Sequence, residues 1–186
     1  DPATTAGAGS DECGIVVVGA QTQGPPQDWR AVVLADCTVQ GATPSTWARA
    51  AICAMEQFGA DRLIAEINQG GQMVAEVLRQ VDPMVPVKSV HASRGKVARA
   101  EPVAALYEQG RVGHVAGLDA LEDQMCRMTA RGYEGGGSPD RVDALVWALH
   151  ALRGEFNRQN EAVLRALRSV WSGGVKRLVR FSWGGQ

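Results

Sequence analysis

The sequence lacks the features that mark secreted and membrane proteins. No apolar run approaches the roughly 20 residues that a membrane-spanning helix needs, and the first residues do not follow the basic-then-apolar layout of a signal peptide. Its four cysteines stand far apart with no CxxC pair, which argues against a zinc knuckle and against a disulfide framework. We therefore expect a cytoplasmic protein whose cysteines are buried free thiols.

Motifs of the common nucleophilic and zinc hydrolases are also missing. The chain contains no GxSxG nucleophile elbow, no HExxH zinc motif, and no cysteine in the sequence context of a catalytic nucleophile. These absences disfavour covalent catalysis through a serine or cysteine.

Length and composition indicate an ordinary globular domain. The 186 residues are 45% hydrophobic and 21% charged, close to globular averages, and a chain of this length buries roughly two thirds of its unfolded surface. The net charge of -1 conceals a basic C-terminal end, since residues 155–186 hold six Arg or Lys against two Glu. A nearly neutral total charge with a basic end permits DNA binding without predicting it.

Apolar periodicity and turn residues predict alternating strands and helices. Strands are expected at residues 13–19, 31–35, 62–67 and 85–90, and helices at residues 43–59, 73–81, 98–108, 121–128 and 138–154. Thr43-Pro44 and Ser138-Pro139 suit the starts of two helices, and Gly59 and Gly154 suit their ends. A strand pair followed by strand–helix units predicts an α/β fold, a mixed sheet with helices on both faces. We expect one domain at residues 1–153, followed at residues 154–186 by a helix and a basic tail with a role at the surface.

Four acidic residues stand where such a fold would bring them together. Asp1 precedes the strand pair, Glu66 ends an apolar strand, and Asp140 and Asp143 share one face at a helix start. The helix dipole favours the ionised form of the last two, while a charge in an apolar strand is costly without a partner. A divalent cation is a suitable partner, because three or four carboxylates are what a two-metal phosphodiesterase site needs.

Each of these residues also has a structural interpretation. Asp140 is favoured in the first turn of a helix for capping alone, Glu66 could pair with an arginine such as Arg99, and a terminal Asp1 means nothing by itself. Trp47 and Trp147 fall on apolar helix faces and are interpreted as core residues. His91 and His114 lack the partner spacing of a zinc site and are given structural roles as well.

Several segments together resemble the nuclease motifs of the large terminase subunits of tailed phages. They are Asp1-Pro2-Ala3, residues 11–17 (DECGIVV), residues 66–71 (EINQGG), residues 96–114 with RAEPV and LYEQGRV, and residues 138–149 (SPDRVDALVWAL), of which the last is the most specific. The resemblance covers about residues 1–153 in order.

This resemblance implies a ribonuclease H-like fold and a nuclease that cuts concatemeric genome DNA during packaging with Mg²⁺ or Mn²⁺. Asp1, Glu66 and Asp143 match the metal-binding positions, and Asp140 matches an extra acidic position of related Holliday-junction resolvases. Lys96 and Arg99 would lie beside the path of the DNA, although structural roles are as well supported. The implied partners are double-stranded DNA, the terminase ATPase domain, the small terminase subunit and the portal protein, in the cytoplasm of the host.

The sequence also departs from the family pattern. The Walker A loop of the ATPase half is absent, and the strand that carries the first Asp in this family would precede residue 1. We therefore expect a fragment or an isolated domain that does not translocate DNA by itself. Two alternatives stay open: a nuclease resembling the Holliday-junction resolvases that cuts branched DNA, and a non-catalytic module that docks on DNA or the portal.

Overall fold

An apolar strand, β1 (Glu12–Gln21), lies inside the molecule and is buried on both of its faces. Successive side chains of a strand point to opposite faces of its sheet, and β1 uses both. Cys13, Ile15 and Val17 enter one hydrophobic cluster, while Val16 and Val18 enter the other. A strand with this pattern needs a covering layer on each face. The structure, a computed structural model, describes residues 12–22, 25, 28–67, 72–166 and 175–183. Of residues 72, 154–166 and 175–183 it describes the backbone alone.

The sheet built around β1 is mixed, as the sequence predicts. Its strand order is β5 (Val87–Val90), β4 (Arg62–Glu66), β9 (Val175–Trp183), β1, β2 (Arg30–Asp36) and β6 (Val112–His114), and β3 (Val39–Gln40) also pairs with β1. The β1–β2 and β1–β9 pairs are antiparallel, whereas β4 runs parallel to both β5 and β9. The carboxyl ends of β4 and β5 therefore meet at one edge of the sheet.

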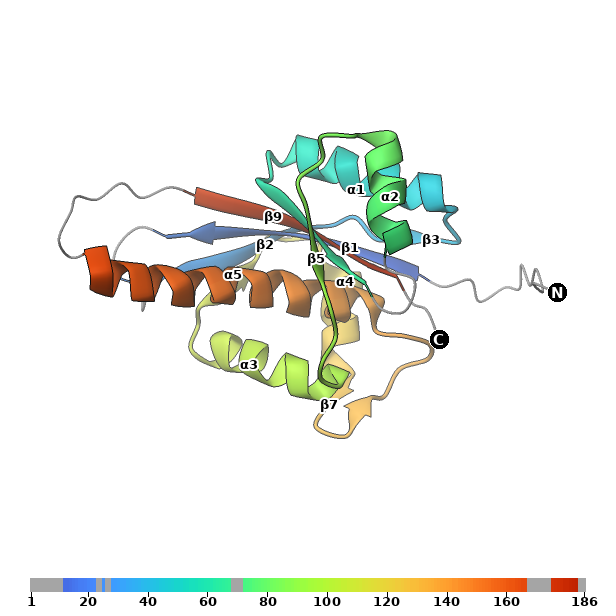
Figure 1. Ribbon diagram of the computed structural model, residues 1–186. Helices are drawn as coiled ribbons and strands as arrows, with labels where there is room; N and C mark the ends of the chain where they lie inside the picture. Colours follow the sequence, from blue (N-terminus) through green and yellow to red (C-terminus); the bar gives the residue numbers. More distant parts are fainter. Residues whose placement is uncertain (1–11, 23–24, 26–27, 68–71, 167–174, 184–186) are drawn as a thin grey trace.

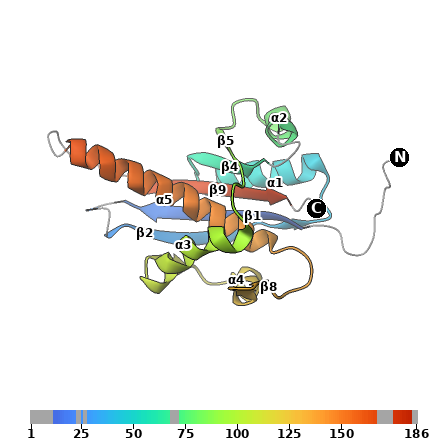
Figure 2. The same ribbon diagram turned by 60° about the horizontal axis from the view of Figure 1, so that its bottom comes forward.

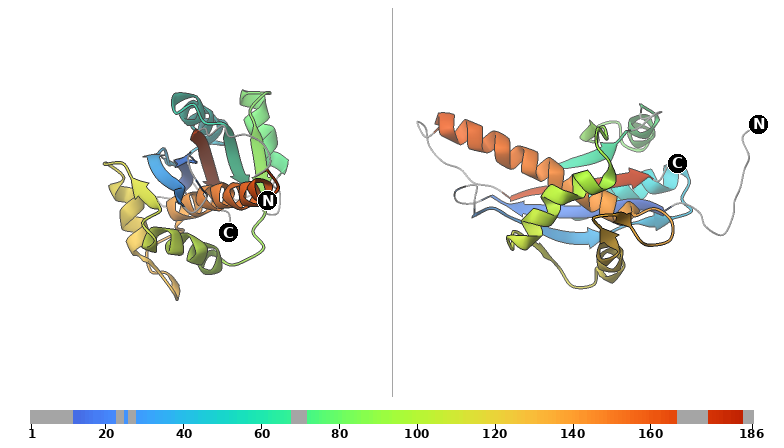
Figure 3. Two further views of the ribbon diagram at one scale, coloured as in Figure 1. Left: turned by 90° about the vertical axis from the view of Figure 1, so that its left-hand side faces the viewer. Right: turned by 90° about the horizontal axis from the view of Figure 1, so that it is seen from below.

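Helices cover both faces of this sheet, as predicted (Figure 1). Helices α1 (Pro44–Gln57) and α2 (Gln72–Val81) lie over one face. On the other face lie α3 (Lys96–Glu108), α4 (Asp119–Cys126) and α5 (Asp140–Ala166), together with a small hairpin of β7 (Met128–Thr129) and β8 (Gly132–Tyr133). Figure 2 shows that α5 lies against the sheet, and Figure 3 (left) shows that α3 lies on the side of α5 away from the sheet.

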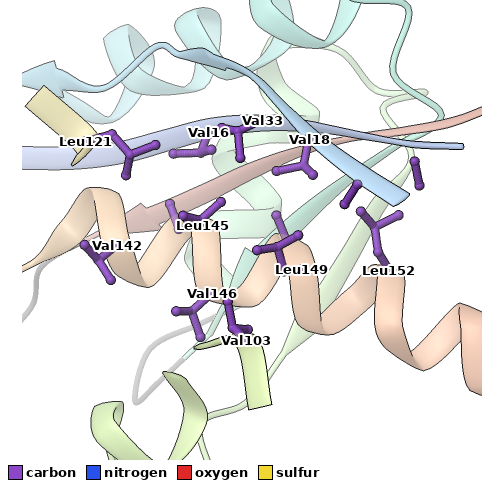
Figure 4. Packing of buried hydrophobic residues seen from close by; sticks show 14 of the residues in the cluster. Val16, Val18, Val33, Val103, Leu121, Val142, Leu145, Val146, Leu149 and Leu152 are labelled. Carbon is purple, nitrogen blue, oxygen red and sulfur yellow. The ribbon is translucent and has the colours of Figure 1, made fainter. Parts of the chain in front are cut away.

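The core between α5 and the sheet explains this stacking. Leu145, Leu149 and Leu152 point from α5 toward the strands, and Val146 points the other way, toward Val103 of α3 (Figure 4). Burying one large aliphatic side chain contributes about 1.5–3 kcal/mol, so this apolar stripe fixes α5 on the sheet. The first turn of α5, which carries Asp140 and Asp143, is thereby held at one end of the sheet.

Most predicted elements are confirmed with small shifts at their ends. Thr43 caps α1 by accepting a hydrogen bond from the Thr46 backbone N–H, and Gly59 adopts a φ of 56° just beyond the helix. Such a left-handed conformation is one that glycine adopts without steric cost. The cysteines are free, as expected, but only Cys13 is buried; Cys37 is half-buried, and Cys53 and Cys126 are exposed. None of the described helices is long and apolar enough to cross a membrane.

The C-terminal region differs from the prediction. Helix α5 does not end at Gly154 but continues to Ala166, and a single glycine inside a helix costs only about 1 kcal/mol. The tail, expected at the surface, provides β9 in the middle of the sheet, paired with β1 from Cys13–Trp183 to Gln21–Val175. The division into domains at residue 153 stays a prediction, although both α5 and the sheet extend across that boundary.

Gly14 makes the close approach of α5 to β1 possible. A Cβ atom at this position would lie 2.1 Å from the backbone oxygen of Asp140. We predict that Gly14→Ala destabilises the protein by about 1–3 kcal/mol, the usual cost of overpacking a rigid core, measured by urea unfolding. Gly113→Ala is the control, because nothing lies within 4 Å of its added Cβ. Equal stability of the two variants would show that α5 does not depend on this contact.

Candidate active site where strand β4 meets helices α3 and α5

Three chain segments that are distant in sequence meet at the carboxyl end of β4. Glu66 is the last residue of β4, Arg99 lies in the first turn of α3, and Asp143 lies in the first turn of α5. The Asp143 backbone N–H donates to the Pro139 carbonyl at 2.8 Å, which closes the first turn of α5. The sheet and the two helix starts therefore present their side chains to a common point.

The guanidinium of Arg99 lies between the two carboxylates. Its Nη1 is 3.2 Å from Oε1 of Glu66, and its Nη2 is 3.2 Å from Oδ1 of Asp143. All three side chains are at most 10% exposed. A buried charge is stable only when it is paired and hydrogen-bonded, and here each acid takes one nitrogen of the same fork.

Trp147 completes the environment of this pair, a role that sequence reasoning missed. Its indole Nε1–H donates to the Glu66 Oε2 at 2.8 Å, and the Arg99 Cζ lies 5.0 Å from the centre of its ring. The interpretation of Trp147 as a core residue was wrong, because it is half-buried and belongs to neither hydrophobic cluster, whereas Trp47 is buried in the core as expected. The signal was present in the sequence, because Trp147 follows Asp143 by four residues and so shares its helix face.

Lys96 approaches the site from the solvent side. Its Nζ lies 2.8 Å from Oδ2 of Asp143 and donates to the Ser138 Oγ at 2.9 Å, while the side chain is 44% exposed. Ser138 in turn donates to the Asp140 Oδ1 at 2.8 Å. Asp140 is 3% exposed, and burial raises the pKa of its carboxyl above the usual value despite this hydrogen bond. Asp140 thus joins the cluster through Ser138 rather than through Arg99.

A second charge network fixes the start of α5 to the sheet. Arg141 donates from Nε to the Asp36 Oδ2 at 2.8 Å and from Nη1 to the Glu12 Oε2. The hydrogen bond from Arg141 holds the pKa of Glu12 below its usual value, against the opposing effect of burial. Since Asp36 and Glu12 belong to β2 and β1, this network orients the turn that also carries Asp143.

The sequence-predicted site residues are brought together in part. Glu66 and Asp143 converge, with Asp140 one short connection away, and the alternative pairing of Glu66 with Arg99 is confirmed. Lys96 and Arg99 contact the carboxylates. Their position beside the DNA stays a prediction. Asp1 lies outside the described residues.

Of the two histidines named from the sequence, His91 lies near this site, because it follows Val90, the β5 residue that pairs with Glu66, whereas His114 lies on β6 at the other side of the sheet. His114 has a structural role, since its ring accepts or donates hydrogen bonds at 2.6 Å to the Tyr107 hydroxyl and at 2.8 Å to Glu122. These contacts connect β6 with α3 and α4. His91 is exposed just beyond β5.

The converging carboxylates fit a hard divalent cation. Mg²⁺ keeps several waters and is usually held by one or two carboxylates plus substrate phosphates, and Glu66 and Asp143 supply two carboxylates aimed at one point. Within the described ranges no group of three or more His, Cys, Asp or Glu is placed to hold a metal ion. The fit to a divalent cation therefore rests on the carboxylates of Glu66 and Asp143. In this structure Arg99 provides the positive charge between them.

A family model matches most of the chain. The family described as the terminase RNaseH-like domain matches residues 1–152, a range that includes Glu66, Asp140 and Asp143 and ends inside α5. A comparison with curated proteins found no match.

We predict that Arg99 stabilises the metal-free protein far more than Lys96 does. Removing one partner of a buried ion pair typically costs about 3–5 kcal/mol, whereas an exposed ion pair contributes about 0–1 kcal/mol. Arg99→Gln should therefore lower the free energy of unfolding by about 3–5 kcal/mol and Lys96→Gln by about 1 kcal/mol or less, measured by urea unfolding in EDTA.

Arg153→Gln is the matched control for this comparison. Arg153 is exposed on α5, ten residues beyond Asp143 and so about 15 Å away along the helix axis. It should leave the stability unchanged within about 0.5 kcal/mol. A loss in Arg99→Gln no larger than in this control would contradict the buried ion-pair network.

Proposed function

Since the chain belongs to the terminase RNaseH-like domain family, we propose that it is a metal-dependent DNA endonuclease that cuts concatemeric viral DNA during genome packaging. The family match supports a nuclease-type role in a terminase. Metal dependence is inferred from the geometry of the site. The observation that carries it is the convergence of Glu66 and Asp143 on one point at the carboxyl end of β4.

The proposed ligands of Mg²⁺ or Mn²⁺ are Asp1, Glu66 and Asp143, with Asp140 as an additional acidic group. Two such ions held by these carboxylates would supply a lowered pKa for a bound water and positive charge for the leaving oxygen. No serine or cysteine nucleophile is needed, which agrees with the absence of the corresponding motifs in the sequence.

Neighbouring residues orient the two converging carboxylates. The Trp147 indole fixes one oxygen of Glu66, and the bonds of Arg141 to Asp36 and Glu12 fix the turn that carries Asp143. Partners of this kind hold ligands in place, and their loss typically lowers metal affinity or activity by 10–100-fold. The arrangement is therefore preorganised by groups other than the proposed metal ligands.

An exposed basic segment stands beside the carboxylates and is suited to the DNA backbone. The residues that connect β5 to α3 are exposed and include Arg94, with Lys96 at the start of the helix. Because β4 and β5 are parallel, this segment begins at the edge of the sheet where Glu66 lies. Lysine and arginine contacts to phosphates position a duplex without reading its sequence.

The proposed partners follow from this role. They are double-stranded DNA, the terminase ATPase domain, the small terminase subunit and the portal protein, and the site of action is the cytoplasm of the infected host. The family match supports DNA and a packaging motor in general, and the individual partners belong to the proposal.

One observation favours a second candidate, a non-catalytic module that docks on DNA or the portal. Glu66 and Asp143 are already neutralised by Arg99 and Lys96, and a fold that kept its acids only for stability would show the same ion pairs. A resolvase-like nuclease is the remaining alternative, and it differs in preferring branched DNA.

The test is nicking and linearisation of a supercoiled plasmid by the purified chain in Mn²⁺, Mg²⁺ and EDTA. We expect cutting with either metal and none in EDTA. Glu66→Gln and Asp143→Asn should each lower the rate at least about 100-fold, because several kcal/mol of charge stabilisation are lost. A branched duplex in the same assay separates the resolvase alternative.

Asp123→Asn is the control, since Asp123 is an exposed carboxylate on α4, and its rate should equal that of the wild type. If the folded wild type is inert in both metals, the docking module becomes the better description. If cutting survives in Asp143→Asn, the activity comes from another site.

A further inference from the structure

The position of Arg99 has a consequence for how the site accepts cations. Its guanidinium bonds the same two carboxylates that are the proposed metal ligands, at 3.2 Å each. The residue is 7% exposed, so water screens these contacts weakly. A divalent cation between the carboxylates and a guanidinium in the same place would repel each other strongly in so buried a site.

We propose that Arg99 is an internal counter-ion that competes with divalent metal for Glu66 and Asp143 and so sets the metal affinity of the site. This inference rests on the proposed function and adds a means of regulation to it. Without metal, Arg99 holds two like charges close together. When metal binds, the guanidinium has to give up at least one of the two carboxylates.

The bonds of Arg99 are incomplete in the arrangement described. Its Nε–H is buried, and no acceptor for it is found among the described residues. An unsatisfied buried donor is unfavourable, so the paired state does not use the full bonding capacity of the guanidinium. Movement away from the carboxylates toward another acceptor, such as a phosphate oxygen of DNA, could satisfy this group.

Trp147 provides a surface on which such a movement can occur. The Arg99 Cζ lies 5.0 Å from the centre of the indole ring, and a cation is attracted to an aromatic face while it stays within about 6 Å of that centre. The guanidinium can therefore shift over the ring and keep this contact while it gives up a bond to Glu66 or Asp143 and gains another acceptor.

Lys96 is less suited to the same competition. It contacts only one of the two converging acids, through Oδ2 of Asp143, and its side chain is 44% exposed. Solvent screens such a contact and reduces its effect. Arg99 has two contacts in a buried site, so it is the residue whose removal should change metal binding most.

Titration of the purified chain with Mn²⁺ alone tests the proposal, with calorimetry and the electron paramagnetic resonance signal of free Mn²⁺ as readouts. Arg99→Gln should bind Mn²⁺ at least about tenfold more tightly than the wild type, because the competing charge is gone. Added Mn²⁺ should also raise its melting temperature more than it raises that of the wild type. Arg153→Gln, which removes an exposed charge, should bind Mn²⁺ as the wild type does.

Arg99→Lys keeps the charge but loses the planar fork that holds two carboxylates at once. It should bind Mn²⁺ more tightly than the wild type and less tightly than Arg99→Gln. It also carries the test by itself if Arg99→Gln does not fold. Unchanged or weaker affinity in the folded Arg99 variants, or no Mn²⁺ binding to any protein of the series, would overturn the proposal.

The plasmid assay is scored separately from these titrations. Tighter Mn²⁺ binding in the Arg99 variants, together with a wild type that never cuts DNA, would support the counter-ion and refute the proposed nuclease. Metal-dependent cutting with an affinity that does not respond to Arg99 would support the nuclease and refute the counter-ion.

Discussion

Two buried acids that share one arginine form the interaction on which the geometry of the site depends. Glu66 ends strand β4, Asp143 lies in the first turn of a long helix, and Arg99 joins them from a third element. Neither carboxylate can be buried alone at acceptable cost, and the guanidinium is costly without them. The ion pairs of Arg99 therefore hold β4, α3 and α5 in place relative to one another. Because the two acids need a positive partner, a divalent metal can take the place of the guanidinium.

Packing elsewhere in the fold brings Glu66, Arg99 and Asp143 together. β1 is buried on both faces, so it requires helices on each side of the sheet, and its small Gly14 lets the first turn of α5 come close. Arg141 then connects that turn to β1 and β2. β9, from the C-terminal end of the chain, joins β1 to β4 in the sheet, and so links the strand under α5 to the strand that ends in Glu66. The site depends on long-range packing more than on any local motif.

The sequence was informative where local rules dominate. Apolar periodicity and capping residues predicted most strands and helices, and the family resemblance selected Glu66 and Asp143, which the fold brings together. Arg99 was considered as a partner of Glu66 or of DNA, but not of Asp143. It contacts both acids, which are separated from it by 33 and 44 positions in the sequence, and no local pattern reports such distant contacts. β9 was missed because its basic residues suggested a surface tail, whereas pairing with two neighbouring strands determines its place.

The most direct measurement is a double-mutant cycle between Arg99 and Asp143, using Arg99→Gln and Asp143→Asn, with unfolding free energies determined in EDTA and again in saturating Mg²⁺. Contacting charged residues couple by about 0.5–3 kcal/mol. Competition between Arg99 and metal predicts a favourable coupling of about 2 kcal/mol in EDTA that falls toward zero in Mg²⁺, because the metal replaces the guanidinium as the partner of Asp143. A coupling near zero in EDTA, or one of equal size in both conditions, would contradict it.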